Sequence, residues 1–173
     1  MHIVLLGMMA SGKTTIGKVL SKSLSIPFHD TDKEIEFHEK TSIKSIFENK
    51  GEQYFREIES KIIIETLKKK KSSVIALGGG AFLSASVRKY VNENSISVWL
   101  NVDIDTILTR AKKNQSRPIL KNKSDEEIKK IYENRLKYYE MAKIHIDCNK
   151  KTKIECAEEL VSKVKITGLN ESN

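Results

Sequence analysis

The segment with the clearest chemistry lies near the N-terminus and reads Gly7-Met8-Met9-Ala10-Ser11-Gly12-Lys13-Thr14-Thr15. It contains the pattern G-x-x-x-x-G-K-[ST] between a short apolar run and a segment of helical period. In such a loop, backbone N–H groups point at phosphate oxygens, and the following helix N-terminus adds partial positive charge. We expect Lys13 to reach the β- and γ-phosphates and the Thr14 hydroxyl to ligate Mg²⁺. The segment therefore predicts binding of a nucleoside triphosphate.

A pair of carboxylates, Asp30 and Asp32, follows the next β-favouring run. Ligands of parallel α/β proteins collect at the carboxyl ends of the strands, so both carboxylates are candidates for the reaction site. One could hold Mg²⁺, and the other could orient and deprotonate an attacking hydroxyl. The same segment also fits a helix capping box, because Thr31 is followed by Glu34 three residues later. Both interpretations can apply to one segment.

Other polar features indicate little when each is taken alone. The run Gly78-Gly79-Gly80 could let the backbone approach a ligand closely, or it could form a plain turn. Arg56 has Glu59 one helical turn away, which is typical of a surface ion pair. Arg117, in the candidate lid, and Arg135, on the following helix, are likewise weak indications when taken alone.

The elements that must position these residues follow from hydrophobic periodicity. Short β-favouring runs alternate with longer helical patterns, which predicts one α/β domain of three layers (α/β/α) with a central parallel sheet of about five strands. The strands are expected at residues 3–6, 27–29, 74–77, 96–100 and 145–147. The helices are expected at residues 13–24, 33–40, 42–49, 51–71, 84–91, 103–112, 124–139 and 152–165. We expect residues 1–166 to form the domain, with a mobile lid at about 113–123 and a flexible tail at 167–173.

Composition narrows the classes of partner. The 173 residues carry 31 Lys+Arg against 23 Asp+Glu, a net charge of +8, which favours anionic partners in general. The basic residues are dispersed, and four consecutive lysines, Lys68–Lys71, fit a solvated helix end, so we expect no nucleic-acid partner. No apolar stretch approaches the ~20 residues that span a bilayer, and we expect a cytoplasmic monomer without a membrane partner. Cys148 and Cys156 lack metal-ligand spacing and are interpreted as ordinary thiols.

Taken together, these pieces resemble the shikimate kinase family, in family order and spacing from Met1 to about Lys165. The segments that carry the resemblance are the glycine-rich loop, Phe28-His29-Asp30-Thr31-Asp32, Gly51-Glu52-Gln53-Tyr54-Phe55-Arg56-Glu57-Ile58-Glu59, Leu77-Gly78-Gly79-Gly80-Ala81, Arg110, Arg117-Pro118-Ile119-Leu120 and Arg135-Leu136-Lys137-Tyr138-Tyr139. The resemblance implies an α/β fold of the P-loop kinase type. It also implies transfer of the γ-phosphoryl group of ATP to the 3-hydroxyl of shikimate, with Mg²⁺ as cofactor.

The resemblance also implies a role for each matching residue. On the acceptor side, Asp32 would hydrogen-bond the reacting hydroxyl, and the carboxylate of shikimate would lie between Arg56 and Arg135. The remaining acceptor contacts would come from Gly78, Gly79, Gly80, Phe47 and Phe55. On the nucleotide side, the contacts would come from residues 7–15, with Asp30 and Thr14 at Mg²⁺, Arg110 and Lys153 near the adenine, and Arg117 closing with the lid on the transferring phosphoryl group. The catalytic set would be Asp32, Lys13 and Arg117.

Two departures from the family pattern and two rival functions complete the expectations. Ala10 replaces a glycine of many members, which is tolerable if its φ is negative, and the segment around Lys153 lacks a proline that some members place against the adenine. A kinase for gluconate or a nucleoside monophosphate is one rival, and a nucleotide-dependent switch or nucleic-acid-binding ATPase is the other.

Four of the five arginines fall at predicted ligand positions, and only Arg88 is unassigned. We therefore expect Arg to be reserved for ligands and Arg88→Lys to be silent in activity.

Overall fold

The sheet that carries the site consists of parallel strands in the order β2-β3-β1-β4-β5. The structure is a computed structural model in which residues 1–113 and 124–170 are described. The strands of the described chain are β1 (His2–Leu6), β2 (Phe28–Asp30), β3 (Val74–Ala76), β4 (Ser95–Asn101) and β5 (Ile144–Asp147). The predicted α/β class with a central five-stranded parallel sheet is confirmed.

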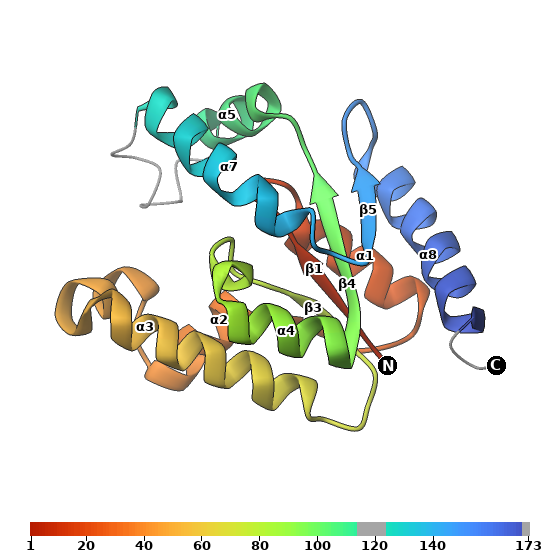
Figure 1. Cartoon of the computed structure of the whole chain (residues 1–173), viewed down its shortest axis with the longest axis horizontal. Coiled ribbons are helices and arrows are strands. Elements are labelled where there is room, and N and C mark those ends of the chain that lie inside the picture. Colours follow the sequence, from red (N-terminus) through yellow and green to blue (C-terminus); the bar gives the residue numbers. More distant parts are fainter. Residues whose placement is uncertain (114–123, 171–173) are drawn as a thin grey trace.

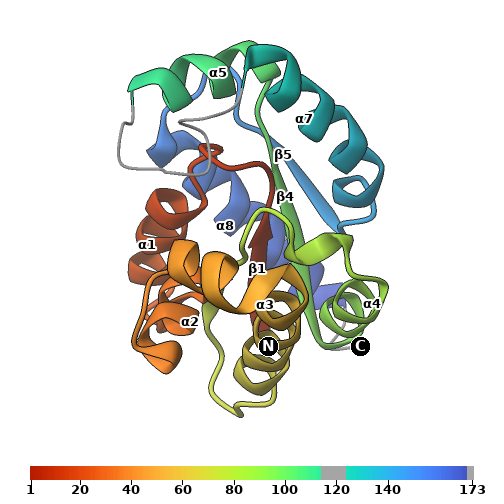
Figure 2. The same ribbon diagram turned by 90° about the vertical axis from the view of Figure 1, so that its left-hand side faces the viewer.

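Helices cover both faces of this sheet. Their bounds are α1 (Lys13–Ser23), α2 (Thr31–Glu39), α3 (Ile43–Leu67), α4 (Ala85–Asn94), α5 (Ile104–Lys113), α7 (Asp125–Tyr139) and α8 (Lys153–Asn170), with a short 3₁₀ helix, η1 (Ala81–Leu83). Figures 1 and 2 show α1 and α8 together on one face, and α4 with the C-terminal part of α3 on the other. α5 and α7 cross above the carboxyl ends of the strands (Figure 2).

The strands β1, β3 and β4 are buried because helices cover the sheet on both sides. All five residues of β1 are buried, and Ile3 to Leu6 form a continuous apolar run, as expected for a central parallel strand. Its neighbours are in register at Leu5↔Ala76 on one side and Leu6↔Trp99 on the other. A second, smaller core of Ile35, Ile46, Phe55 and Ile62 joins α2 to α3. This second core builds the part of the molecule that faces the glycine run.

Helix boundaries follow local signals at several positions. Gly51 interrupts α3 with φ 80°, ψ 172°, so the two helices predicted on either side of this residue meet at a kink. Ser124 and Glu127 form the predicted capping box, with Glu127 N–H donating to Ser124 Oγ at 3.2 Å and Ser124 N–H to Glu127 Oε2 at 2.7 Å. The Ser84 hydroxyl accepts from Val87 N–H at 3.4 Å, as predicted for an N-cap.

Two local predictions are wrong. Thr31 and Glu34 do not form a capping box, because Thr31 is fully buried as the first residue of α2 and its hydroxyl bonds to the neighbouring strand instead. α8 extends to Asn170, so the first residues of the tail predicted from Thr167 are helical. Glycine keeps its N–H donor, so a helix can continue through Gly168, at a cost of about 1 kcal/mol relative to alanine. Among the described residues, no helix is long and apolar enough to cross a membrane.

Candidate active site

The loop between β1 and α1 has the curled backbone that phosphate binding needs. Gly7 and Gly12 adopt φ 140° and φ 100°, which side-chain-bearing residues rarely do. A Cβ on Gly7 would also lie 2.9 Å from the carbonyl oxygen of Leu100 on β4, so only glycine fits there. The Gly12 carbonyl accepts from Thr15 and Ile16 N–H at 3.0 and 2.9 Å, which starts α1 directly after the loop.

Ala10 does not meet the condition of a negative φ. Its φ is 64°, in the left-handed region. The loop curls through this position on its way from Met8 to Gly12, and the turn imposes the same backbone on whichever residue stands there. For an L-residue with a Cβ, this conformation costs about 1–2 kcal/mol.

Two basic side chains lie against this loop. Lys13 Nζ donates to the carbonyl oxygens of Gly7 and Met8 at 2.8 and 3.0 Å. Its ammonium group therefore lies inside the curl, where phosphate oxygens can replace the carbonyl oxygens as acceptors. Arg110, from α5, donates through Nη1 to the Ala10 carbonyl at 3.3 Å, so α5 brings a second cation to the outer side of the loop.

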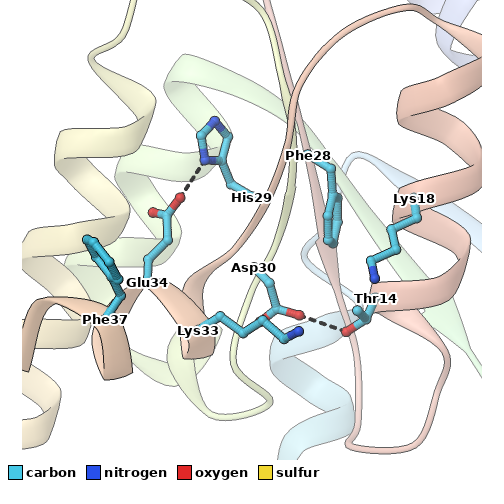
Figure 3. Close-up of a pocket in the computed structure, with 8 residues that line it drawn as sticks. All are labelled: Thr14, Lys18, Phe28, His29, Asp30, Lys33, Glu34 and Phe37. Carbon is cyan, nitrogen blue, oxygen red and sulfur yellow. Dashed lines mark hydrogen bonds and ion pairs between the residues drawn. The ribbon is translucent and has the colours of Figure 1, made fainter. Parts of the chain in front are cut away.

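The two predicted metal ligands are adjacent. The Thr14 hydroxyl donates to Asp30 Oδ2 at 2.8 Å across the gap between α1 and the end of β2 (Figure 3). Hydroxyl and carboxylate oxygens are ligands that Mg²⁺ accepts, and Mg²⁺ commonly takes only one or two from the protein and the others from phosphates and water. The pair therefore fits this cofactor. No group of three or more His, Cys, Asp or Glu residues that could hold a metal occurs in the described part of the chain.

A pocket of about 280 Å³ opens beside this pair. It is lined by Thr14, Lys18, Phe28, His29, Asp30, Lys33, Glu34 and Phe37 (Figure 3). On its wall, His29 Nδ1 bonds to Glu34, whose second oxygen accepts from the Thr66 hydroxyl at 3.1 Å. These bonds join β2, α2 and α3 behind Asp30.

The glycine run is the point where charged residues from three helices converge. A Cβ on Gly78 would lie 2.7 Å from both Asp32 Oδ1 and Glu59 Oε1. A Cβ on Gly79 would lie 3.2 Å from Arg135 Nη1, and a Cβ on Gly80 only 2.9 Å from Arg56 Nη1. The absent side chains therefore leave the space that these four groups occupy. The crowding explains why these positions carry no side chains, and the approach of a ligand to this backbone stays a prediction.

Arg56 is held by two carboxylates of its own helix. Its Nη1 donates to Glu59 Oε2 at 2.7 Å, and its Nη2 to Glu52 Oε1 at 3.2 Å. Glu59 is only 3% exposed, and this burial raises the pKa of its carboxyl group. The negative charge of Asp32 raises the pKa further, whereas the positive charges of Arg56 and Arg135 lower it. The pair is thus a buried anchor for a guanidinium group and not the surface ion pair that spacing alone suggests.

The aromatic residues predicted to wall the acceptor pocket lie together beside Arg56. The rings of Phe47 and Phe55 are 4.6 Å apart between centroids, and Arg56 Cζ lies 5.1 Å from the centroid of Phe55. Phe55 is 4% exposed and belongs to the smaller core, while Phe47 is partly buried against it. The smaller core thus holds both rings next to the guanidinium group.

The structure leaves some predicted site residues apart. Arg117 and the lid at 113–123 lie almost wholly outside the described residues, and only Lys113, the last residue of α5, is described. Lys153 is exposed in the first turn of α8, and its contact with adenine stays a prediction. Sequence analysis also missed Thr31, whose hydroxyl donates to Ala76 O at 3.2 Å and accepts from Gly78 N–H at 3.0 Å. No local sequence pattern predicts these two hydrogen bonds, because they join residues far apart in the chain.

A parallel sheet with a phosphate-binding loop between β1 and α1, and a cluster of charged groups around the glycine run at the same sheet edge, is typical of the class of small P-loop kinases. The chain belongs to the shikimate kinase family, because the family model "Shikimate kinase" matches residues 9–165. It is 42% identical over 164 residues to a shikimate kinase of Sulfurihydrogenibium sp., covering 95% of this chain and 98% of that one.

Solved structures agree with this assignment. The shikimate kinase of Acinetobacter baumannii in complex with shikimate is similar with a TM-score of 0.89 at 30% identity, over 96% of this chain and 93% of that one. The shikimate kinase of Aquifex aeolicus is similar with a TM-score of 0.85 at 36% identity, over 98% of this chain and 99% of that one. The family uses ATP as its co-substrate.

Proposed function

We propose that this protein transfers the γ-phosphoryl group of ATP to the 3-hydroxyl of shikimate, giving shikimate 3-phosphate and ADP. The observation that carries the proposal is the convergence of Asp32, Arg56 and Arg135 around Gly78–Gly80. This group lies at the same edge of the sheet as the loop of residues 7–15, because both follow the carboxyl ends of neighbouring parallel strands. A donor and an acceptor site thus face one another.

The two arginines suit a carboxylate. A guanidinium group offers two parallel N–H donors to one carboxylate, a geometry that an ammonium group does not match. Arg56 is fixed by Glu52 and Glu59, and Arg135 by the carbonyl of Gly79, so both lose little freedom when the acid binds. The acid is therefore expected to be oriented by the carboxylate at one end of the ring, with its hydroxyls turned towards Asp32.

The reacting groups need little covalent help from the protein. Phosphoryl transfer is accelerated mainly by positioning and by neutralising charge on the phosphoryl oxygens. Asp32 orients the attacking hydroxyl and accepts its proton, and Lys13 stabilises the β- and γ-phosphates from within the loop. Thr14 and Asp30 would hold Mg²⁺, which supplies further neutralisation of phosphate charge when bound. Arg117 is assigned to the transferring phosphoryl group by resemblance alone.

We further propose that the protein acts as a cytoplasmic monomer with no nucleic-acid or membrane partner. The dispersed lysines support this proposal, because polyanion-binding proteins gather basic residues on one face or stripe. A single monomeric peak in size-exclusion chromatography with light scattering is the expected result. A dimer at micromolar concentration would overturn the proposal that the protein is a monomer.

The substrate is tested by measuring ADP release with shikimate, gluconate, AMP and CMP in parallel. Shikimate should be the preferred acceptor, and faster release with any of the other three would overturn the proposal.

Asp32→Asn should lower turnover by about 100-fold or more while ATP binding stays nearly intact, in the range expected for loss of a general base. Glu65→Gln, an exposed carboxylate on α3, is the matched control. Near-normal turnover of Asp32→Asn would remove Asp32 from its role.

A further inference from the structure

The carbonyl oxygen of Gly79 accepts two hydrogen bonds from one face of α7. Tyr139 Oη donates to it at 2.6 Å, and Arg135 Nη1 donates to it at 3.1 Å. The two donors are four residues apart and therefore project from the same side of the helix. α7 also contacts η1, which follows the glycine run directly. The middle peptide of the glycine run is thus tied to α7 by two bonds.

Tyr139 is almost completely buried, although its side chain ends in a polar hydroxyl group. It is 1% exposed, and its ring lies 6.2 Å from that of Trp99 between centroids. A buried phenol needs a hydrogen-bond partner, and Gly79 O is the acceptor it finds. Burial raises the pKa of Tyr139, while the nearby Arg135 opposes this effect, so the hydroxyl keeps its proton and donates at neutral pH.

The position of the Gly79 carbonyl determines where the next N–H points. The described chain has no cis peptide bond, and in a trans peptide the C=O of Gly79 and the N–H of Gly80 point in opposite directions. With the carbonyl turned towards α7, the Gly80 N–H is aimed away from α7. Gly80 is also the residue packed against Arg56, whose Nη1 and Nη2 would lie 2.9 and 3.0 Å from a Cβ there.

We propose that Tyr139 is a positioning residue for the acceptor acid. Its hydroxyl, with Arg135, fixes the Gly79–Gly80 peptide so that the Gly80 N–H and the guanidinium groups of Arg56 and Arg135 form one preformed surface for a carboxylate. Glycine has the greatest backbone freedom of any residue, so three in a row need such an external tie. This inference rests on the proposed binding of a carboxylic acid at these arginines.

The test is Tyr139→Phe, which removes only the hydroxyl and keeps the ring against Trp99. Loss of one hydrogen bond of about 1 ± 0.5 kcal/mol predicts a roughly 2- to 13-fold rise in the KM for shikimate, with kcat within about 2-fold and an unchanged KM for ATP. Tyr138→Phe is the matched control: its ring stacks with Arg88, and shikimate KM should stay at the wild-type value. A purely structural Tyr139 would lower the melting temperature without raising this KM, and that result would overturn the proposal.

A second measurement uses the unmodified protein and so does not depend on a variant that folds. In an NMR titration with shikimate, the Gly80 amide should shift downfield as the carboxylate binds, whereas the Gly51 amide at the kink of α3 should not. An unperturbed Gly80 amide at saturation would overturn the role of this peptide. If wild-type protein neither binds nor phosphorylates shikimate, the proposed function itself fails; if it does both and Tyr139→Phe matches it, only the role of Tyr139 fails.

Discussion

Arg56 Nη1 lies 2.7 Å from Glu59 Oε2, one turn away on α3, and the carboxylate is almost completely buried. Breaking such a pair by removing one partner is costly, because it leaves an unpaired buried charge. The carboxylate therefore keeps the guanidinium group in one place beside Gly80. A buried acid next to Asp32 and two arginines also links the protonation of Glu59 to folding.

Glu59→Gln should change how stability depends on pH. Burial raises the pKa of Glu59 above its ordinary value of 4.5, so the folded protein binds this proton more tightly than the unfolded chain does. The contribution of Glu59 to stability is therefore fully present below pH 4.5 and is lost as pH rises through the raised pKa. The stability of Glu59→Gln relative to wild type should rise across this window in urea unfolding. A difference that stays constant as pH rises would contradict the prediction.

Gly78→Ala should impair catalysis more than folding. The added Cβ would lie 2.7 Å from Asp32 Oδ1 and Glu59 Oε1, so both carboxylates must shift. A displacement near 1 Å at reacting groups costs about 100-fold in rate, and we expect kcat/KM for shikimate to fall by that order. Gly51→Ala is the control, because nothing lies within 4 Å of its Cβ and its φ of 80° penalises only stability. Activity of Gly78→Ala equal to that of Gly51→Ala would contradict the packing argument.

Ala10→Gly should stabilise the protein. The φ of 64° at Ala10 costs an L-residue about 1–2 kcal/mol, and part of the gain is offset because glycine has more freedom in the unfolded chain. We expect the free energy of unfolding to increase by about 0.5–1 kcal/mol. Ala111→Gly, in helix α5, should lower it by a similar amount. Equal losses in both variants, measured by urea denaturation, would argue against a strained Ala10.

Arg88→Lys should leave activity unchanged, as the sequence analysis expects, but it should lower stability. Arg88 Nη1 donates to the carbonyl oxygens of Phe82 and Leu83 at 2.9 and 3.1 Å, and its guanidinium lies 4.9 Å from the Tyr138 ring. Lysine keeps the charge but loses the planar group, so we expect a loss of about 1 kcal/mol in unfolding free energy. Shikimate kinetics should be unchanged, because no ligand is assigned to Arg88. The exposed neighbour Lys89 provides the comparison: a Lys89→Ala melting curve as low as that of Arg88→Lys would contradict this role.

Arg88 also corrects the idea that arginine is reserved for ligands. Its guanidinium group donates to two carbonyl oxygens at the end of η1 and lies over an aromatic ring of α7. The planar group of this arginine therefore has a structural role. Nothing in the sequence around Arg88 indicates these partners. The aromatic ring comes from a helix some fifty residues further along the chain.

Several features followed from the sequence by itself. The phosphate-binding loop could be identified because Gly7, Gly12, Lys13 and Thr14 act within one short stretch of chain. The helices and strands could be placed because periodicity is a property of neighbouring residues, and the break at Gly51 and the capping box at Ser124 are local in the same sense.

Only the tertiary structure decided how the separate pieces meet. The order β2-β3-β1-β4-β5 brings Asp32 and the glycine run together at adjacent strand ends, and α3 and α7 add Arg56 and Arg135 from distant parts of the chain. It also decided that Thr31 bonds to β3 and that Tyr139 holds Gly79. The physical reason is range: propensity and capping act over about one helical turn, whereas these contacts depend on strand order and on which helix face packs where.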